Sequence, residues 1–298
     1  MLAQLLRRSI LSQMLLGAGL GVWVATSQIQ SLWFVPVFAL MLPIATLVLM
    51  DTASALMSRT PSEPAAMWLR SLFGEFRAGI LVFLFRQPWT QLPPALLPAT
   101  GEGPKVPVVL VHGYLCNHRI WDEIAAALRA RGHTVFAVNL EPLFVSIDRY
   151  APVVEAAVQA LTQNTGQTKV ALVGHSMGGL AIRVWMRVNG TSRVARVLTL
   201  GTPHAGTKLA KGSLPTNAKQ MLWKSDWLAA LAASEDDTTR GLIRIAITPQ
   251  DNIVCPQRAQ VLPGITPVVF EGLGHVQMCL DPTVMDWVCQ QVGELEST

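Results

Sequence analysis

A serine between two glycines stands where a short apolar run gives way to a helical pattern. The run from Lys169 to Val173 predicts a buried strand, and Gly174-His175-Ser176-Met177-Gly178-Gly179 follows it directly. A sharp turn from strand to helix would raise the Ser176 hydroxyl into a cleft, where a base can take its proton and make it a nucleophile. The backbone amide of Met177, at the start of the helix, would point at an oxygen that becomes negative as the serine attacks.

An acid and a histidine follow this serine in the order that such a nucleophile requires. Asp251 lies in the loop after the strand-like run from Leu242 to Ile247, and His275 follows the run from Thr266 to Phe270. His275 would take the proton of Ser176 and pass it to the leaving group, while Asp251 would hold the imidazole in the correct tautomer. Aspartate is also common in turns and at helix caps, so a structural role is the alternative for Asp251.

The developing oxyanion needs a second backbone donor besides the amide at the start of the helix. An earlier strand-like run ends at Val111 and is followed by His112, Gly113 and Tyr114. Gly113 lets the chain turn back toward the serine, so we expect the Tyr114 amide to be this donor. Leu115 is the alternative donor and a candidate substrate contact. His112 lies on the wrong loop to be the base, and we interpret it as a structural residue that braces the loop.

These motifs resemble the bacterial lipase/esterase branch of the α/β-hydrolase superfamily, which includes triacylglycerol lipases and related lipid deacylases. The matching segments are Val111-His112-Gly113-Tyr114, Gly174-His175-Ser176-Met177-Gly178-Gly179, Gly201-Thr202-Pro203-His204-Ala205-Gly206-Thr207, Asp251-Asn252-Ile253-Val254 and Gly274-His275. The resemblance covers the chain from Lys105 to its end. It implies an α/β fold with a mostly parallel central sheet flanked by helices. It also implies a serine hydrolase that cleaves carboxylic esters, of lipids or other acyl groups, through a Ser-Asp-His triad and an acyl-enzyme.

Two other functions fit the same residues. An acyltransferase would form the same acyl-enzyme and pass its acyl group to an alcohol or an amine instead of water. A membrane-tethered scaffold could have kept the fold without catalysis, although the intact set of Ser176, Asp251 and His275 argues against this reading.

The sequence gives no reason to expect a metal ion or another cofactor. The four cysteines lack Cys-x-x-Cys spacing, and few carboxylates follow His275. Cys255 and Cys279 lie at the same distance after Asp251 and His275, so a disulfide between them stays open if the domain is exported. The net charge of +4 is scattered and forms no basic stripe, which argues against nucleic acid as a partner. We expect an ester or lipid substrate and membrane lipid as partners, and the oligomeric state stays open.

Residues 1–60 hold two long uncharged segments and predict a two-helix transmembrane hairpin. Ile10 to Ala25 is slightly short for a bilayer span, and Leu32 to Met50 has the required length. The arginines lie outside the connector between them, so the positive-inside rule places both ends in the cytoplasm. We therefore expect a bacterial inner-membrane protein with a cytoplasmic catalytic domain. A cleaved secretory signal that ends near Ala25 is the alternative.

Residues 61–104 predict an amphipathic helix from Pro64 to Phe85 and then a proline-rich linker. The apolar residues of this segment recur every three or four positions, and Arg70, Glu75 and Arg77 fall on its polar side. The helix could rest in the membrane interface or pack on the domain that follows. If the linker separates the two parts, a chain that begins near Pro98 should fold and stay active.

Residues 105–298 alternate strand and helix patterns and predict a parallel sheet of about six strands. The alternation stops in an insertion from about 208 to 240, where Met221, Trp223 and Trp227 belong to an apolar stripe. We expect a lid here whose three side chains contact the substrate. An ordinary surface helix that packs its apolar side is the alternative.

Overall fold

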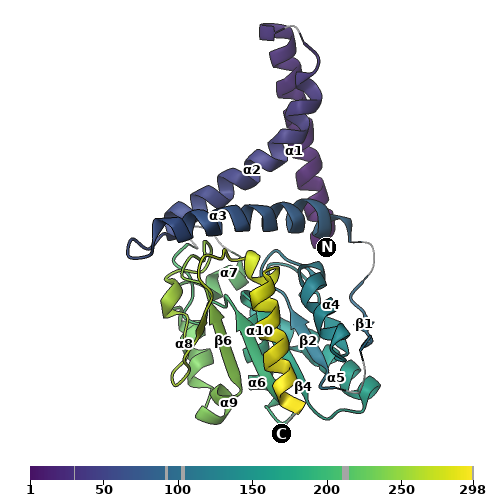
Figure 1. Ribbon diagram of the computed structural model, residues 1–298, viewed down its shortest axis with the longest axis vertical. Helices are drawn as coiled ribbons and strands as arrows, with labels where there is room; N and C mark the ends of the chain where they lie inside the picture. The colour runs from purple at the N-terminus through teal and green to yellow at the C-terminus, as the bar shows by residue number, and fades with distance from the viewer. Residues whose placement is uncertain (30, 91–92, 102–104, 210–214, 297–298) are drawn as a thin grey trace.

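The computed structural model describes residues 1–29, 31–90, 93–101, 105–209 and 215–296. Two long helices, α1 (Leu2–Val24) and α2 (Phe34–Ser58), extend away from a sheet domain. A third helix, α3 (Ala65–Gly79), lies crosswise between this pair and the sheet domain (Figure 1). The helical path continues from α3 through a π-helical segment, Ile80–Arg86, to a 3-10 turn, Gln87–Trp89.

The two long helices approach each other closely through small residues of α1. A Cβ on Gly17 would overlap the carbonyl oxygen of Phe38, so only glycine fits at this crossing. Close approach through small residues is typical of helix pairs in lipid, where burial of apolar surface gives no driving force. The segments Leu2–Ser27 and Phe34–Ser58 are long and apolar enough to cross a membrane, a test that a signal sequence also passes.

The sheet domain has seven strands among the described residues, in the order β1-β3-β2-β4-β5-β6-β7. β1 runs antiparallel to β3, and every other pair is parallel. A mostly parallel sheet was expected, and the short β1 at its edge is the additional strand. The strands are β1 (Leu96–Leu97), β2 (Val108–Val111), β3 (Val135–Ala137), β4 (Val170–His175), β5 (Val194–Leu200), β6 (Ile243–Ile247) and β7 (Val268–Val269).

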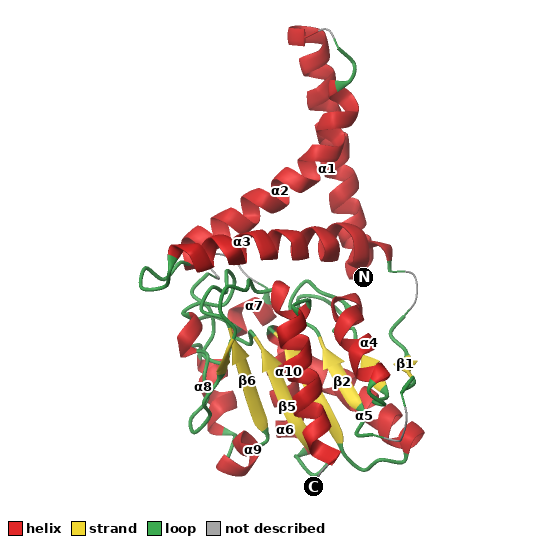
Figure 2. Ribbon diagram, in the orientation of Figure 1, coloured by secondary structure: helices red, strands yellow, loops and turns green. Residues whose placement is uncertain are grey.

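Helices cover both faces of the sheet because its central strands are apolar on both sides (Figure 2). Val108 and Leu110 of β2 pack with α4 and α10, while the alternate residues Val109 and Val111 pack with α5 and α6. The helices of the sheet domain are α4 (Asp122–Ala130), α5 (Ala151–Thr165), α6 (Met177–Asn189), α7 (Thr216–Gln220), α8 (Asp226–Ala233), α9 (Asp237–Gly241) and α10 (Pro282–Gly293).

Helix α3 packs on the sheet domain with a side of mixed character. Glu75 is 3% exposed and Trp68 is 6% exposed, whereas Leu69 and Phe73 on the other side are 59% and 70% exposed. Arg70 is exposed on this outer side as well. The helix thus packs on the sheet domain, which is one of the two placements that the sequence left open. The sheet domain therefore has contacts with residues before Pro98, which a chain that begins there would lack.

Candidate active site

Ser176 occupies the turn between β4 and α6 that the sequence predicts. Its φ and ψ are 54° and −128°, a backbone conformation that L-residues rarely adopt. Such strain costs about 1–3 kcal/mol and persists only where the surrounding structure enforces it. Here the Ser176 amide donates to the carbonyl of Leu200 at the end of β5 (2.8 Å), and its own carbonyl accepts from the Gly179 amide (3.1 Å). The neighbouring strand and the first turn of α6 thus fix the serine.

Asp251 and His275 form a buried pair. His275 Nδ1–H donates to Asp251 Oδ2 at 2.8 Å, and the two side chains are 5% and 3% exposed. The other carboxylate oxygen, Oδ1, accepts from the amides of Ile253 (2.8 Å) and Val254 (2.7 Å). Asp251 therefore does both things that the sequence left open, because one oxygen builds the turn and the other orients the imidazole.

The charge of Asp251 sets the proton affinity of His275. Burial lowers the pKa of His275, but the charge of Asp251, its hydrogen bond and the charge of Glu75 outweigh burial and raise this pKa above its ordinary value. With Nδ1 committed to Asp251, Nε2 is the nitrogen that can exchange a proton with a substrate or a nucleophile.

The loops after β4, β6 and β7 bring Ser176, Asp251 and His275 to the same edge of the sheet. A Cβ on Gly201, the residue after Leu200, would lie 3.2 Å from both Asp251 Oδ2 and His275 Nδ1. The rings of His175 and His275 pack with their centroids 4.6 Å apart. In the part of the chain that the structure describes, the Ser176 hydroxyl makes no hydrogen bond, so it is available for attack.

The predicted second oxyanion donor lies beside the serine. A Cβ on Gly113 would lie 2.6 Å from Ser176 Cβ and 3.2 Å from its Oγ, so the backbone of this loop touches the nucleophile. Among the described residues the Tyr114 amide has no hydrogen-bond partner, as a donor kept for a substrate oxygen requires.

His112 braces this loop, as the sequence predicts. Its Nδ1–H donates to the carbonyl of Gly113 at 2.8 Å, and its Nε2 accepts from the Leu140 amide at 2.9 Å. Burial lowers the pKa of His112 to about 4, so the ring is neutral and serves one donor and one acceptor.

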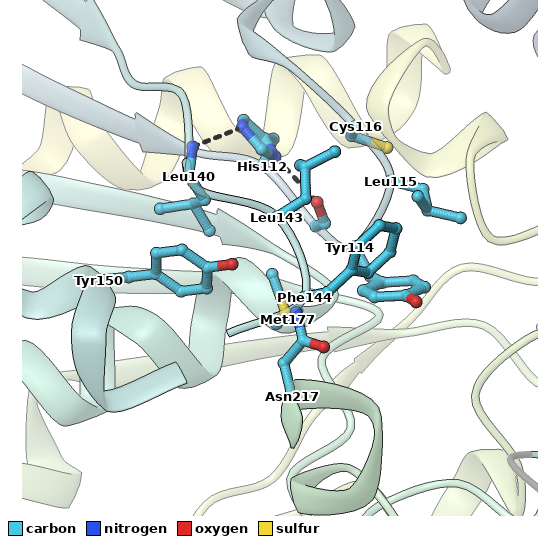
Figure 3. A pocket seen from close by; sticks show the side chains of 11 residues that line it. His112, Tyr114, Leu115, Cys116, Leu140, Leu143, Phe144, Tyr150, Met177 and Asn217 are labelled. Carbon is cyan, nitrogen blue, oxygen red and sulfur yellow. Dashed lines mark hydrogen bonds between the residues drawn. The ribbon is translucent and has the colours of Figure 1, made fainter. Parts of the chain in front are cut away.

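A small cavity lies beside Met177, the residue after Ser176 (Figure 3). It holds about 210 Å³ of free space. Leu115 lines it, as expected for a substrate contact, and the loop after β3 contributes residues that sequence reasoning missed. That loop could have been found, because β3 pairs with β2 and both end at the same edge of the sheet. The lining residues are His112, Gly113, Tyr114, Leu115, Cys116, Leu140, Leu143, Phe144, Tyr150, Met177 and Asn217.

Three residues of the expected lid lie elsewhere. Met221 is 8% exposed in the core beneath α5 and α6. The ring of Trp223 packs against the ammonium groups of Lys208 and Lys224 at 5.5 and 5.7 Å. Trp227 Nε1–H donates to Asp148 Oδ2 at 2.9 Å. None of the three lines the cavity of Figure 3.

The insertion therefore favours the alternative of an ordinary surface helix. Leu228 and Leu231 of α8 are 3% and 0% exposed, because this helix packs its apolar side on the sheet domain. Residues 210–214 of the insertion lie outside the described residues. Cys255 and Cys279, left open as a disulfide, are buried free thiols in the structure.

Comparisons with known proteins agree with this architecture. The family described as alpha/beta hydrolase fold matches residues 106–243. A triacylglycerol lipase of Burkholderia plantarii is 35% identical over 127 residues, which are 40% of this chain and 35% of that lipase. A triacylglycerol lipase of Pseudarthrobacter phenanthrenivorans is 36% identical over 120 residues, which are 37% of each protein. The chain thus spans about a third of the length of these curated relatives.

Solved structures give the same result for the fold. The mature lipase of Bacillus licheniformis has a TM-score of 0.56 at 18% identity, with 68% of this chain and 99% of that chain covered. Lipase B of Aspergillus fumigatus has a TM-score of 0.56 at 16% identity, with 66% and 55% covered. This chain has the α/β-hydrolase fold and resembles the lipase/esterase branch of that superfamily.

Proposed function

We propose that this chain is a membrane-anchored serine hydrolase that cleaves carboxylic esters, with lipid or other acyl esters as substrates. The observation that carries the proposal is the strained Ser176 beside the buried Asp251–His275 pair, with the unpaired Tyr114 amide next to it. The likeness to proteins named triacylglycerol lipases supports the choice of carboxylic esters.

In this proposal Ser176 Oγ attacks the ester carbonyl carbon while its proton passes to Nε2 of His275. The amides of Met177 and Tyr114 stabilise the oxyanion, and the N-terminus of α6 adds its positive dipole. His275 then protonates the departing alcohol, which leaves an acyl group on Ser176. Water, deprotonated by His275, attacks this acyl-enzyme and releases the acid, and the proton returns to Ser176.

The lining of the cavity indicates where an acyl chain would lie. Leu115 and Phe144 line the cavity and are 36% and 40% exposed, so they lie at its open side. In this proposal the acyl chain extends past these two residues.

Contacts at both ends of the helical hairpin support a membrane anchor. The Leu2 amide donates to Glu141 at 3.4 Å, and the Ser58 carbonyl accepts from Gln257 at 3.0 Å. The start of α1 and the end of α2 therefore both touch the sheet domain, as a hairpin with both ends on one side of a bilayer requires. The arginines near these ends favour the cytoplasm as that side.

Labelling with a fluorophosphonate and hydrolysis of p-nitrophenyl esters from acetate to palmitate test the proposal. The wild-type chain should label and hydrolyse, and Ser176→Ala should lose both, with a rate loss of about 10⁴-fold or more. Ser192→Ala, an exposed serine in the turn before β5, is the matched control and should behave as wild type. Activity of Ser176→Ala within tenfold of the parent would show that the nucleophile lies elsewhere.

A further inference from the structure

Helix α3 reaches into the loop that carries His275. The carboxylate of Glu75 accepts two hydrogen bonds there, from the Val276 amide to Oε1 (3.0 Å) and from the Gln277 amide to Oε2 (2.9 Å). These amides belong to the two residues that directly follow His275. Both oxygens of one side chain thus hold the backbone on which the imidazole is mounted.

The fit between this loop and α3 is close enough to exclude other residues. A Cβ on Gly274 would lie 2.5 Å from Glu75 Oε2 and 2.6 Å from Glu75 Cβ. Glycine is therefore required at position 274, directly before His275. The Gly274 amide donates to Oε1 of Gln277 at 3.0 Å, which closes the loop on itself. The segment from Gly274 to Gln277 therefore has one position against the helix.

The end of α2 holds the neighbouring acid loop in the same way. Asn252 accepts from the His275 amide through Oδ1 (3.1 Å) and donates to Ser54 Oγ of α2 (3.0 Å). Gln257 donates through Nε2 to the carbonyls of Asp251 (2.8 Å) and Ser58 (3.0 Å). The two loops that carry the acid and the base are thus both tied to helices that precede the sheet domain.

A purely structural role is a poor explanation for a carboxylate at this site. Glu75 is 3% exposed and forms no ion pair with a lysine or arginine in the described ranges. A buried charge without a cation is costly, whereas a hydroxyl or an amide could tie a helix to a loop at lower cost. A carboxylate differs in accepting two amides at once and in placing negative charge near His275, whose pKa that charge raises.

We propose that Glu75 is a positioning residue of the active site, which holds the backbone after His275 and so aims the imidazole at Ser176. Helix α3 is then part of the catalytic apparatus, not only a connection between the anchor and the enzyme. This inference rests on the proposed serine hydrolase function.

The test compares Glu75→Ala and Glu75→Gln in the full-length protein in detergent micelles. Glu63→Gln is the matched control, because Glu63 bonds Arg258 across the same interface (2.6 Å), seven residues after Asp251, without contacting the loop that carries His275. Steady-state hydrolysis of p-nitrophenyl butyrate gives kcat and KM, and fluorophosphonate titration gives the number of active sites. Hydrogen exchange of the peptide around residues 272–280 reports on the loop without any need for activity.

Glu75→Ala should lower kcat per titrated site by about 10- to 100-fold, since a displacement of about 1 Å at a catalytic group costs about this much. KM should change by less than about threefold, because the ester cavity is not touched. Glu75→Gln keeps one acceptor oxygen and should fall between Glu75→Ala and wild type. Exchange at Val276 and Gln277 should be faster in both variants, and Glu63→Gln should match wild type.

Two results would overturn the inference. One is wild-type kcat per titrated site in both Glu75 variants, even if fewer sites are active, because that is the signature of a merely structural residue. The other is unchanged exchange of the loop amides. If Glu75→Ala does not fold, Glu75→Gln decides by the same criteria. A wild-type chain that neither labels nor hydrolyses contradicts the proposed function instead, and exchange then still decides whether Glu75 holds the loop.

Discussion

Glu75→Gln should change how the stability of the fold depends on pH. Burial raises the pKa of Glu75 to about 7 from its ordinary 4.5, against the opposing effects of the Val276 amide, His275 and the Gln277 amide. A group with a raised pKa in the folded state contributes stability that is fully present below the unfolded value. That stability is lost as the pH rises through the folded value. For Glu75 the window therefore runs from about pH 4.5 to about pH 7.

The size of the effect follows from these two pKa values. The difference between 4.5 and about 7 corresponds to about 3 kcal/mol of unfolding free energy lost by the wild-type chain across this window. A domain of this size shifts its melting temperature by about 2–4 °C per kcal/mol. The melting temperature of Glu75→Gln minus that of wild type should therefore increase by about 6–12 °C from pH 4.5 to pH 8.

Several other titratable groups face Glu75 and must be included. They are Asp51 of α2, His275, and the thiols of Cys116 and Cys279. The pKa of His275 is raised partly by Glu75, so the substitution lowers it. This moves the pH dependence in the same direction, because His275 also loses stability as the pH rises through its raised pKa.

The assay is thermal unfolding followed by tryptophan fluorescence in detergent at four pH values between 4.5 and 8. Glutamine leaves one loop amide without an acceptor, which costs about 1–3 kcal/mol at every pH. The measured quantity is therefore how the difference in melting temperature between Glu75→Gln and wild type changes with pH, not the size of that difference at one pH. A difference between wild type and Glu75→Gln that stays constant from pH 4.5 to 8 would refute the reasoning.

Three further predictions concern the triad, the cavity and the helical segment. Asp251→Asn should lower kcat by about 10⁴-fold through loss of the correct tautomer, whereas Asp281→Asn, at the cap of α10, should change it little; the reverse order would assign the acid role elsewhere. Phe144→Ala should alter KM along a series of p-nitrophenyl esters more than Trp223→Ala does, since of these two residues Phe144 lines the cavity. Equal effects on KM would support the original prediction that Trp223 contacts the substrate as part of a lid. A chain that begins near Pro98 should lose more than about tenfold in kcat, because it lacks the bonds to both catalytic loops; full activity would contradict this, and carbonate extraction of the full chain checks the anchor.

The positions of Ser176, Asp251 and His275 could be predicted from the sequence because one rule governs them. Each of these residues follows a parallel strand, and parallel strands end at the same edge of the sheet. The loops that carry Ser176, Asp251 and His275 therefore lie close together. The bounds of the strands mattered little: β7 is Val268–Val269, shorter than the run from Thr266 to Phe270. The position of a loop residue depends on where the preceding strand ends, not on where that strand begins.

The lid and the role of α3 could not be predicted, for a related reason. An apolar stripe predicts that one side of a helix will be buried, but it does not show whether protein, lipid or substrate buries it. Trp223 packs against two lysines and Trp227 donates to an aspartate, and neither lines the cavity. In α3 the periodicity grouped Arg70, Glu75 and Arg77 on one polar side, but the structure buries Glu75 and exposes both arginines. Nothing in the sequence near Glu75 indicates that its partners are two backbone amides some two hundred residues away.

The orientation of α3 explains how a buried carboxylate can be retained at this position. Leu69 and Phe73 lie on the exposed side of the helix, and Glu75 lies on the side that meets the sheet domain. The loops at that edge carry backbone amides that must find acceptors, and Glu75 supplies two acceptors from a single position. Ionisation of Glu75 weakens the fold above neutral pH, yet the ionised form is the one that accepts both amides and stabilises the imidazolium of His275. In the role proposed for Glu75, the helix loses stability and gains the geometry and charge of the base, as is common where a residue serves a reaction.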